Sequence, residues 1–175
     1  MKHELEDGRV VDIVPISEKI PTRWFLDHIN SLIAENTFVL LDKKLTLKHE
    51  TEWKKNMIKG VRDGKRICFA ALYKKRIVGA CNAEKGLGKE SQNIILGISV
   101  AKDFRKAGLG EFLMRKTIAE AKKKLKSRNI YLHVADPNKP AKKLYEKVGF
   151  KEMARFPKWA KHKGKYVDVV WMLLK

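Results

Sequence analysis

The sequence predicts an α/β domain, and three observations lead to this fold class. The chain has 175 residues, 44% of them hydrophobic, which is enough for one domain with a sizeable core. Short runs rich in β-branched and aromatic residues alternate with longer runs in which apolar residues recur at helical spacing. No linker, repeat or low-complexity segment interrupts the pattern. We therefore expect a single domain over residues 1–175.

The first third of the chain predicts one strand followed by two helices. Residues 9–16 form the strand-like run. Thr22 and Thr46 each precede a stretch with apolar residues at helical spacing, and threonine is a favourable residue at the N-cap. We expect Thr22 to cap the first helix and the second helix to start after Thr46.

A β-hairpin is predicted next, with strands over 66–73 and 76–83 that are rich in β-branched and aromatic residues. Cys68 and Cys81 lie in these strands and are expected to face each other across the hairpin. The sequence has no Cys-x-x-Cys, so a zinc site is not expected. Two reduced, half-buried thiols are the favoured interpretation.

The second half predicts strand, helix, strand, helix and two final strands. The helix over 110–125 has a broad apolar stripe, which is typical of a core-facing helix. The next helix has Pro140 in its first turn and Gly149 after its end, as start and stop signals require. The predicted strands are 92–101, 129–135, 150–156 and 166–174, and the stretch 157–165 is expected to be a basic loop.

The segment 105–110, Arg-Lys-Ala-Gly-Leu-Gly, joins a strand-like run to a helix-like run. The first N–H groups of a helix lack internal partners and carry the positive end of its dipole, so such a turn suits a pyrophosphate. Gly108 and Gly110 let the backbone approach a ligand, and Arg105 and Lys106 add positive charge. The segment lacks the third glycine of the dinucleotide fingerprint and the Gly-Lys-Ser/Thr of a P-loop.

A second motif, over residues 138–150, reads Asn-Lys-Pro-Ala-Lys-Lys-Leu-Tyr-Glu-Lys-Val-Gly-Phe and follows another strand-like run. Together the two motifs resemble the GCN5-related N-acetyltransferase (GNAT) superfamily. In that family Arg-x-x-Gly-x-Gly binds the pyrophosphate of acyl-coenzyme A, and the later helix contributes an asparagine and a tyrosine to the thioester end. The order of predicted elements also fits, so the resemblance covers nearly the whole chain. It implies a mixed, mostly antiparallel central sheet of about seven strands with helices on both faces.

The resemblance implies acetyl-CoA as co-substrate and no metal. In the family, a bulge splays the strand that holds Gly97 from the next parallel strand, and the pantetheine arm bonds to the exposed edge as an added strand would. Alternatively, Gly97 is only a weak strand residue. The residues expected to bind acetyl-CoA are Ile98, Ser99, Val100, Arg105, Lys106, Ala107, Gly108, Leu109, Gly110, Glu111 and Asn138.

Acetyl transfer to an amine needs a base for the amine proton, donors for the carbonyl oxygen and an acid for the leaving thiolate. By resemblance, Tyr145 is the acid; its alternative role is a packed aromatic. Asn138 is expected to bind the pantetheine arm or a water, or else only to cap its helix. The oxyanion donor is expected to be a backbone N–H in the stretch 98–100.

His133 departs from the family pattern. Relatives that acetylate ribosomal-protein N-termini have a glutamate at this place, which serves as general base. An imidazole has a pKa near neutral and could do this work directly or through a water. We expect nearby positive charge to favour its neutral form. The alternatives are a structural histidine, with the proton taken by a glutamate or by water.

The sequence says less about the amine that accepts the acetyl group. Glu35, Glu50 and Glu52 lie in the first two predicted helices, which shape the acceptor site in this family, and Glu35 and Glu52 are candidates to hold a cationic amine. The alternative is that these carboxylates are only charges on solvated helix faces. The last strand resembles that of small-molecule members of the family, which favours a small primary amine. Acetylation of protein N-termini or lysines is the alternative.

The net charge is +19, and residues 101–175 alone hold 21 Lys and Arg against 7 Asp and Glu. The positive potential of this half of the chain suits a cofactor with three phosphates. It also permits a hypothesis of another class, a basic nucleic-acid- or ribosome-binding protein, with Trp159 stacking on a base among lysines.

The charged N-terminus is no signal peptide and no run reaches transmembrane length, so we expect a cytoplasmic protein without a membrane partner. Formation of a homodimer is left open.

Overall fold

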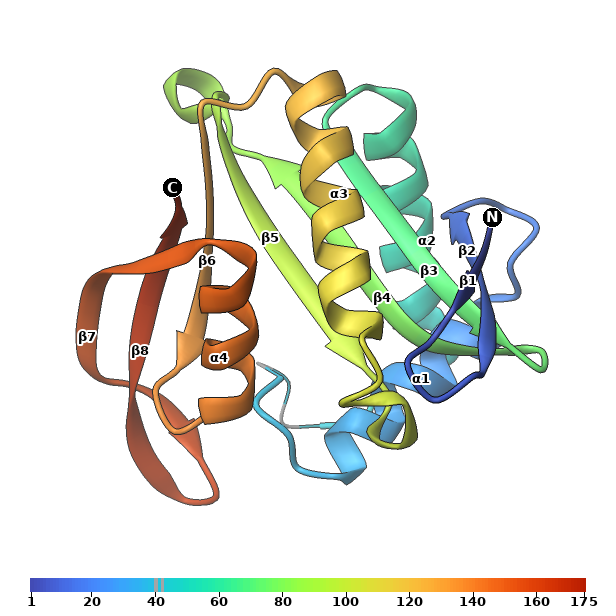
Figure 1. The fold of residues 1–175 in the computed structure, drawn as a ribbon, viewed down its shortest axis with the longest axis horizontal. Helices are drawn as coiled ribbons and strands as arrows, with labels where there is room; N and C mark the ends of the chain where they lie inside the picture. The colour runs from blue at the N-terminus through green and yellow to red at the C-terminus, as the bar shows by residue number, and fades with distance from the viewer. Residues whose placement is uncertain (40, 42) are drawn as a thin grey trace.

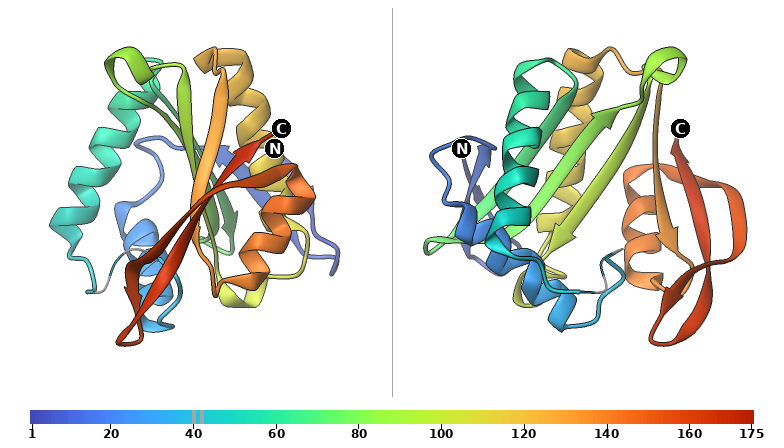
Figure 2. Two further views of the ribbon diagram at one scale, coloured as in Figure 1. Left: turned by 90° about the vertical axis from the view of Figure 1, so that its left-hand side faces the viewer. Right: turned by 180° about the vertical axis from the view of Figure 1, so that it is seen from behind.

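The computed structural model describes residues 1–39, 41 and 43–175. Within them, one sheet of eight strands has the order β1-β2-β3-β4-β5-β6-β8-β7. Helices α1 and α2 cover one face of the sheet, and α3 and α4 cover the other (Figures 1 and 2). The strands are β1 (Lys2–Glu4), β2 (Val10–Pro15), β3 (Arg66–Tyr73), β4 (Arg76–Lys85), β5 (Asn93–Val100), β6 (Asn129–Ala135), β7 (Phe150–His162) and β8 (Lys165–Leu174). The helices are α1 (Thr22–Ala34), α2 (Leu47–Arg62), α3 (Leu109–Leu125) and α4 (Lys139–Val148), with 3-10 turns at Gly88–Glu90 and Lys102–Phe104.

The sheet is mixed and mostly antiparallel, which confirms the expected fold class. Strands β5 and β6 pair in parallel, and the other neighbours pair antiparallel. The eighth strand is β1, which the sequence did not predict because its residues are charged and polar. Such residues are common on the edge strand of a sheet, where one side of the backbone is free.

The basic loop expected over 157–165 is instead the end of a long hairpin, so that expectation is wrong. The pairing of β7 with β8 shifts register between Phe156 and Ala160, which leaves Pro157 outside the regular ladder. The hairpin closes at Lys163 and Gly164, both with positive φ, as a two-residue turn requires.

The two helix starts differ from each other. Helix α2 begins after Thr46, as the sequence predicted, and Thr46 caps it through a capping box with His49. Thr22 is the first residue of α1 rather than its cap, since Pro21 occupies the N-cap position and no side chain caps the helix. Pro21 has φ −58° and ψ 131°, so it lies outside the helix as an N-cap residue does.

Two apolar clusters lie on the two faces of the sheet. The larger one packs under α3 and α4, and the smaller one packs under α1 and α2. Cys81 belongs to the larger cluster and Cys68 to the smaller one, so the two thiols lie on opposite faces and do not face each other as expected. Both are free and fully buried, and burial raises the pKa of each to about 12.

Candidate active site

The sheet opens between its two parallel strands. Strands β5 and β6 pair from Asn93 and Asn129 only as far as Ile95 and Tyr131. Beyond that point β5 continues beside β4, and β6 continues beside β8. The two strands diverge toward their C-terminal ends, as Figure 1 shows. The last residues of β5 therefore have a backbone edge without a strand partner.

The pairing of β4 with β5 shows which backbone groups point to this edge. The N–H of Ala101 donates to the carbonyl of Val78, 2.9 Å away, and the β4–β5 register continues without a shift. In an antiparallel pair, every second residue turns its N–H and C=O away from the partner. Ile98 and Val100 are those residues, so their backbone groups point toward the diverging side.

Gly97 does not mark a bulge, because the β4–β5 register is regular from Gly79 to Lys85. The expectation of a bulge at this place is wrong, and the opening comes from the divergence of β5 and β6. A Cβ at Gly97 would lie 3.0 Å from Oδ1 of Asn82 on β4. The glycine therefore leaves room for the Asn82 side chain on the α1/α2 face of the sheet.

The glycine turn lies between β5 and α3, as the sequence predicts. Gly108 is the N-cap of α3 with φ +79°, a conformation that suits glycine. A Cβ at Gly108 would meet Oε1 of Glu6 at 3.0 Å, and a Cβ at Gly110 would meet Leu144 of α4 at 3.1 Å. The first glycine thus makes room for the turn between β1 and β2, and the second lets α3 and α4 pack closely.

Arg105 contacts one of the predicted acceptor residues. Its guanidinium donates to both carboxylate oxygens of Glu35, at 2.5 and 2.8 Å, and its Nε donates to the carbonyl of Val100 at 3.1 Å. The hydrogen bonds from Arg105 hold the pKa of Glu35 below its ordinary value. The structure thereby joins the predicted cofactor turn to the end of α1.

The other acidic candidates lie in α2. Glu52 is exposed and makes no ion pair with the described residues. Glu50, in the first turn of the helix, is buried, and this burial raises its pKa to about 7. Glu111, expected near the cofactor, pairs with Lys147 at 2.6 Å and with Arg115 at 3.0 Å.

Asn138 and Tyr145 belong to α4. The Oδ1 atom of Asn138 accepts from the N–H of Ala141 at 3.4 Å, so the residue caps the helix, as one of the two sequence hypotheses had it. Tyr145 is 9% exposed and packs in the larger cluster with its ring 6.2 Å from Phe150. Burial raises its pKa, and the neighbouring Cys81 adds to this.

His133 lies on the opposite face of β6 from Tyr145. It is half-buried and stacks on Trp171 of β8, with ring centres 5.9 Å apart. Trp171 also contacts Tyr131 and Phe156, which makes an aromatic surface on the α1/α2 side. Burial lowers the pKa of His133. The direction is the one we expected, but the cause is desolvation and not nearby positive charge.

Sequence reasoning missed His28 of α1. Its Nε2 lies 2.9 Å from Oγ of Ser99 on β5, and the ring is 7% exposed. The available signal was its spacing, since His28 follows Phe25 by three residues and precedes Leu32 by four, which places it on the apolar stripe of the helix. A polar residue on such a stripe must find a buried partner.

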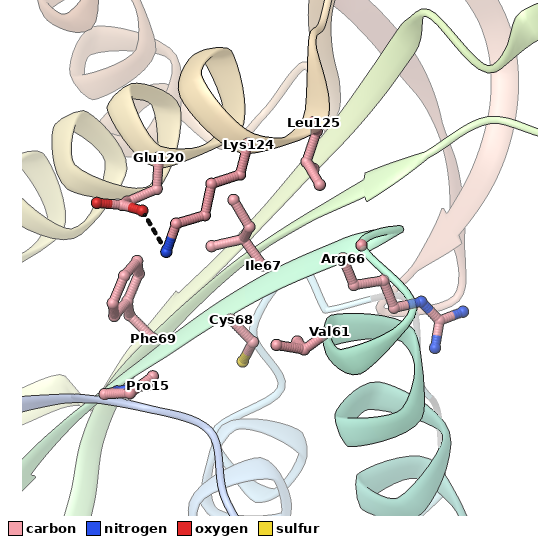
Figure 3. A pocket seen from close by; sticks show the side chains of 10 residues that line it. Pro15, Val61, Arg66, Ile67, Cys68, Phe69, Glu120, Lys124 and Leu125 are labelled. Carbon is pink, nitrogen blue, oxygen red and sulfur yellow. Dashed lines mark ion pairs between the residues drawn. The ribbon is translucent and has the colours of Figure 1, made fainter.

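A cavity of about 160 Å³ lies elsewhere, between β3, α2 and α3 (Figure 3). It is lined by Val61, Cys68 and Phe69, with the ion pair of Glu120 and Lys124 at its rim. None of the predicted site residues lines it, so it is separate from the opening between β5 and β6. Among the described residues no cluster of three or more His, Cys, Asp or Glu could hold a metal, and no helix is long and apolar enough to cross a membrane.

The family of the chain follows from a direct match. The sequence model of the acetyltransferase (GNAT) family matches residues 29–150, well over half of the chain. The chain belongs to the GNAT family. The matched range includes the glycine turn and the helix α4, the two motifs that carried the resemblance.

Solved structures share the fold of this GNAT chain. The ribosomal-protein-alanine N-acetyltransferase from Brucella melitensis is 21% identical, with a TM-score of 0.80 over 93% of this chain and 98% of that one. A GNAT superfamily phosphinothricin acetyltransferase from Sinorhizobium meliloti, in complex with acetyl-CoA, is 10% identical, with a TM-score of 0.80 over 93% of this chain and 86% of that one.

One curated relative is closer in sequence over a shorter stretch. An N-alpha-acetyltransferase from Sulfurisphaera tokodaii is 34% identical over 59 residues, which is 34% of this chain and 35% of the relative. The match thus covers about a third of the length of that relative.

Proposed function

We propose that this GNAT chain transfers the acetyl group of acetyl-CoA to a primary amine, by direct attack in a ternary complex. The observation that carries the proposal is the free edge of β5. It lies between the glycine turn and β6, which carries His133 on one face and packs with its other face in the cluster that contains Tyr145 of α4. An edge with unpaired backbone groups, an anion site at one end and a base and an acid at the other suits a long thioester cofactor.

The residues present fit acetyl-CoA. The backbone groups of Ile98 and the N–H of Val100 face the free edge and can bond an extended arm as an added strand would, whereas the carbonyl of Val100 accepts from Nε of Arg105. The first N–H groups of α3 and the turn at 105–110 offer an anion site for the pyrophosphate. Asn138 stays in this proposal as a helix cap close to the thioester end. Acetyl-CoA, when bound, supplies an activated acyl group.

The proton steps fall to residues on β6 and α4. His133 is neutral at pH 7 because burial lowers its pKa, so it accepts a proton from the amine directly or through a water. Tyr145 holds its proton because burial raises its pKa, so it donates to the leaving sulfur. The N–H of Ile98 is the proposed donor to the carbonyl oxygen.

We infer a small amine as the acceptor, because the last strand resembles that of small-molecule members of the family. Family membership does not itself name an acceptor, since function depends on the site. The second candidate is the N-terminal amine of a protein, which the similarity to the Sulfurisphaera tokodaii N-alpha-acetyltransferase favours.

The test is thiol release from acetyl-CoA across a panel of small amines, N-terminal peptides and lysine peptides, with calorimetry of acetyl-CoA binding beside it. Binding and turnover with an amine support the proposal, and the best substrate distinguishes the two acceptor classes. If acetyl-CoA does not bind, the proposal is wrong, and the basic hairpin with its exposed Trp159 makes nucleic acid the next ligand to try.

A further inference from the structure

The C-terminal strands present aromatic side chains beyond the helices that cover the rest of their face. Helices α1 and α2 make their main contacts with the sheet at β4 and β3. Figure 2 shows the hairpin of β7 and β8 extending past both helices. Three aromatic side chains and one imidazole lie together on this side of β6, β7 and β8, and we call them the aromatic surface: Tyr131, His133, Phe156 and Trp171. All four are half-buried, so each presents part of its ring to a ligand.

Trp171 lies at the centre of the aromatic surface. It is the direct partner of His133 across β6 and β8, and the two rings are 5.9 Å apart at an angle of 27°. Tyr131 stacks on it at 5.4 Å, and Phe156 of β7 lies at 5.5 Å. The proposed base and the indole are therefore neighbours. An amine that meets His133 brings atoms a few bonds away within reach of Trp171.

The carboxylates of these three strands lie on the opposite face of the sheet. Strands β6, β7 and β8 are described in full, and they contain two carboxylates, Glu152 and Asp168. Cross-strand partners share a face, and Glu152 is the partner of Met172, which belongs to the larger cluster under α3 and α4. Asp168 lies two residues before Val170 of the same cluster, so it shares that face too.

The charged residues on the side of the aromatic surface are cationic. The register of β7 with β8 and of β8 with β6 places Lys151 and Lys165 on this side. Burial raises the pKa of Tyr131 and the charge of Glu90 adds to this, but Glu90 precedes β5 and lies at the end of the sheet away from the opening. A second positive charge on the acceptor thus finds no partner among these strands and is repelled by the lysines.

The segment that follows α1 borders the aromatic surface at the opening of the sheet. Glu35 accepts from Arg105 of the glycine turn at 2.5 and 2.8 Å. The ring of Phe38 stacks on His162 of the β7–β8 hairpin, with ring centres 4.1 Å apart. Three residues of chain span at most about 11 Å, so a short piece of chain joins the glycine turn to the hairpin. This crossing favours a small acceptor, and the carboxylate of Glu35 is already engaged by an arginine.

We propose that the aromatic surface binds the body of the acceptor, which is a small primary amine with a planar apolar ring a few bonds from its nitrogen and no second positive charge. The inference rests on the proposed acetyl transfer and names a substrate class for it. The ring of the acceptor stacks on the indole of Trp171 as aromatic pairs do, while its amine meets His133. Polyamines and amino sugars lack the ring and are poor substrates.

The first test compares amines that differ in one property. Phenethylamine and its cyclohexyl counterpart have the same linker and nearly the same size, and only the first has a planar ring. We expect kcat/KM of the wild type to be about two- to tenfold higher for phenethylamine, the scale of one aromatic contact. Putrescine, which carries a second cation and no ring, should be slower than both.

Variants then show whether Trp171 is the source of this preference. Trp171→Leu should bring the ratio of the two kcat/KM values close to one with acetyl-CoA affinity unchanged, and Trp171→Phe, which keeps a ring, should retain part of the ratio. The ratio is the readout because a disturbed His133 would slow both amines alike. Trp53→Leu, at a tryptophan of α2 that is 37% exposed, is the matched control and should leave the ratio unchanged. Should Trp171→Leu fail to fold, Trp171→Phe and Phe156→Leu complete the comparison.

A binding measurement adds a readout without turnover. The indole N–H resonance of Trp171 is assigned by its loss in Trp171→Phe. It should shift when phenethylamine is added to the protein with coenzyme A, and it should shift less with the cyclohexyl amine. A resonance that ignores both amines while they are turned over would overturn the inference.

The outcomes separate this inference from the proposed function. Turnover with equal kcat/KM for the phenyl and cyclohexyl amines, or with putrescine as the better substrate, would overturn the inference and leave the acetyl transfer standing. A peptide preferred over every small amine would do the same. A wild-type dimer that Trp171→Leu dissociates in sedimentation would assign the aromatic surface to a second copy of the chain and overturn the inference. No turnover with any amine would reject the proposed function, and this inference with it.

Discussion

At the scale of single residues, one physical cause acts on both proposed proton carriers, His133 on β6 and Tyr145 on α4. Burial disfavours the charged form of any group. It therefore lowers the pKa of His133, whose charged form is the cation, and raises the pKa of Tyr145, whose charged form is the anion. At pH 7 the imidazole of His133 is therefore neutral and can accept a proton, and the phenol of Tyr145 is protonated and can donate one. Desolvation thus favours the protonation states that the proposed base on β6 and the proposed acid on α4 need.

The role of His133 can be tested through pH. Because burial lowers its pKa below the ordinary histidine value, the neutral form of His133 prevails at pH 7 and is lost at a lower pH than for a solvated histidine. We expect an acidic limb of kcat/KM at that lower pH, and His133→Ala should remove it with a loss of about 10²-fold. His133→Glu should restore part of the rate. An unchanged rate and limb in His133→Ala would mean that the proton leaves by another group or by water. His49→Ala, at an exposed residue of α2, is the control for loss of an imidazole, with its folding checked because His49 also completes the capping box of the helix.

The role of Tyr145 is tested by removal of its hydroxyl. Tyr145→Phe keeps the ring that packs near Phe150, so the fold should persist. We expect kcat to fall by about 10²-fold or more with acetyl-CoA affinity nearly unchanged, since the proton is given only in the transition state. Tyr166→Phe, at a residue that is 68% exposed, should have no such effect. A full kcat in Tyr145→Phe, with the chemical step shown to limit the rate, would reassign the tyrosine to packing.

At the scale of elements, the ion pair of Arg105 and Glu35 fastens the glycine turn to the end of α1. Both side chains are partly exposed, at 37% and 26%, so the pair adds little stability. Its effect is on charge instead, because Glu35 offsets the positive charge of Arg105, a residue proposed to bind the cofactor phosphates. The proposed anion site and helix α1 are thereby coupled through one contact.

We predict that Glu35→Gln tightens acetyl-CoA binding by about two- to fivefold, because it frees the charge of Arg105. Arg105→Ala should weaken binding, and added salt should reduce both differences. Calorimetry at two salt concentrations measures them. Glu52→Gln removes an exposed carboxylate of the same kind and should change nothing, so an equal gain in that variant would show a general effect of net charge.

At the scale of the whole molecule, the features that the sequence predicted depend on neighbouring residues. The features that it missed join residues that are far apart in the chain. The glycine turn, the cap at Asn138 and the alternation along β6 follow local rules, and the structure contains each of them. The pairs His28–Ser99 and Glu35–Arg105 join residues 71 and 70 positions apart, and no local pattern relates them. The prediction of a bulge at Gly97 was wrong for the same reason, since the opening of the sheet depends on how β5 and β6, which are distant in sequence, diverge.

A group of charges ties the C-terminal hairpin to the rest of the sheet, and it yields a prediction for the stability of the whole fold. Asp136, at the end of β6, pairs with Lys142 of α4 at 2.7 Å and with Arg155 of β7 at 3.2 Å. The hydrogen bond from Lys142, followed by that from Arg155, lowers the pKa of Asp136 to about 2. A depressed carboxyl pKa stabilises the fold above the ordinary aspartate pKa, and the gain is lost as the pH falls toward the folded value.

We predict that Asp136→Asn lowers the free energy of unfolding at pH 7 by about 1 kcal/mol, a figure reduced because the carboxylate is 26% exposed to solvent. The gap between variant and wild type should close as the pH is lowered from about 4 to about 2, where wild-type Asp136 also loses its charge. Urea unfolding across this range measures it. Asp12→Asn, at an exposed residue of β2 with no ion pair to the described residues, should follow the wild type throughout. A gap that persists at pH 2 would show that the side chain acts through packing or hydrogen bonds that survive protonation, and that charge does not hold the hairpin against α4.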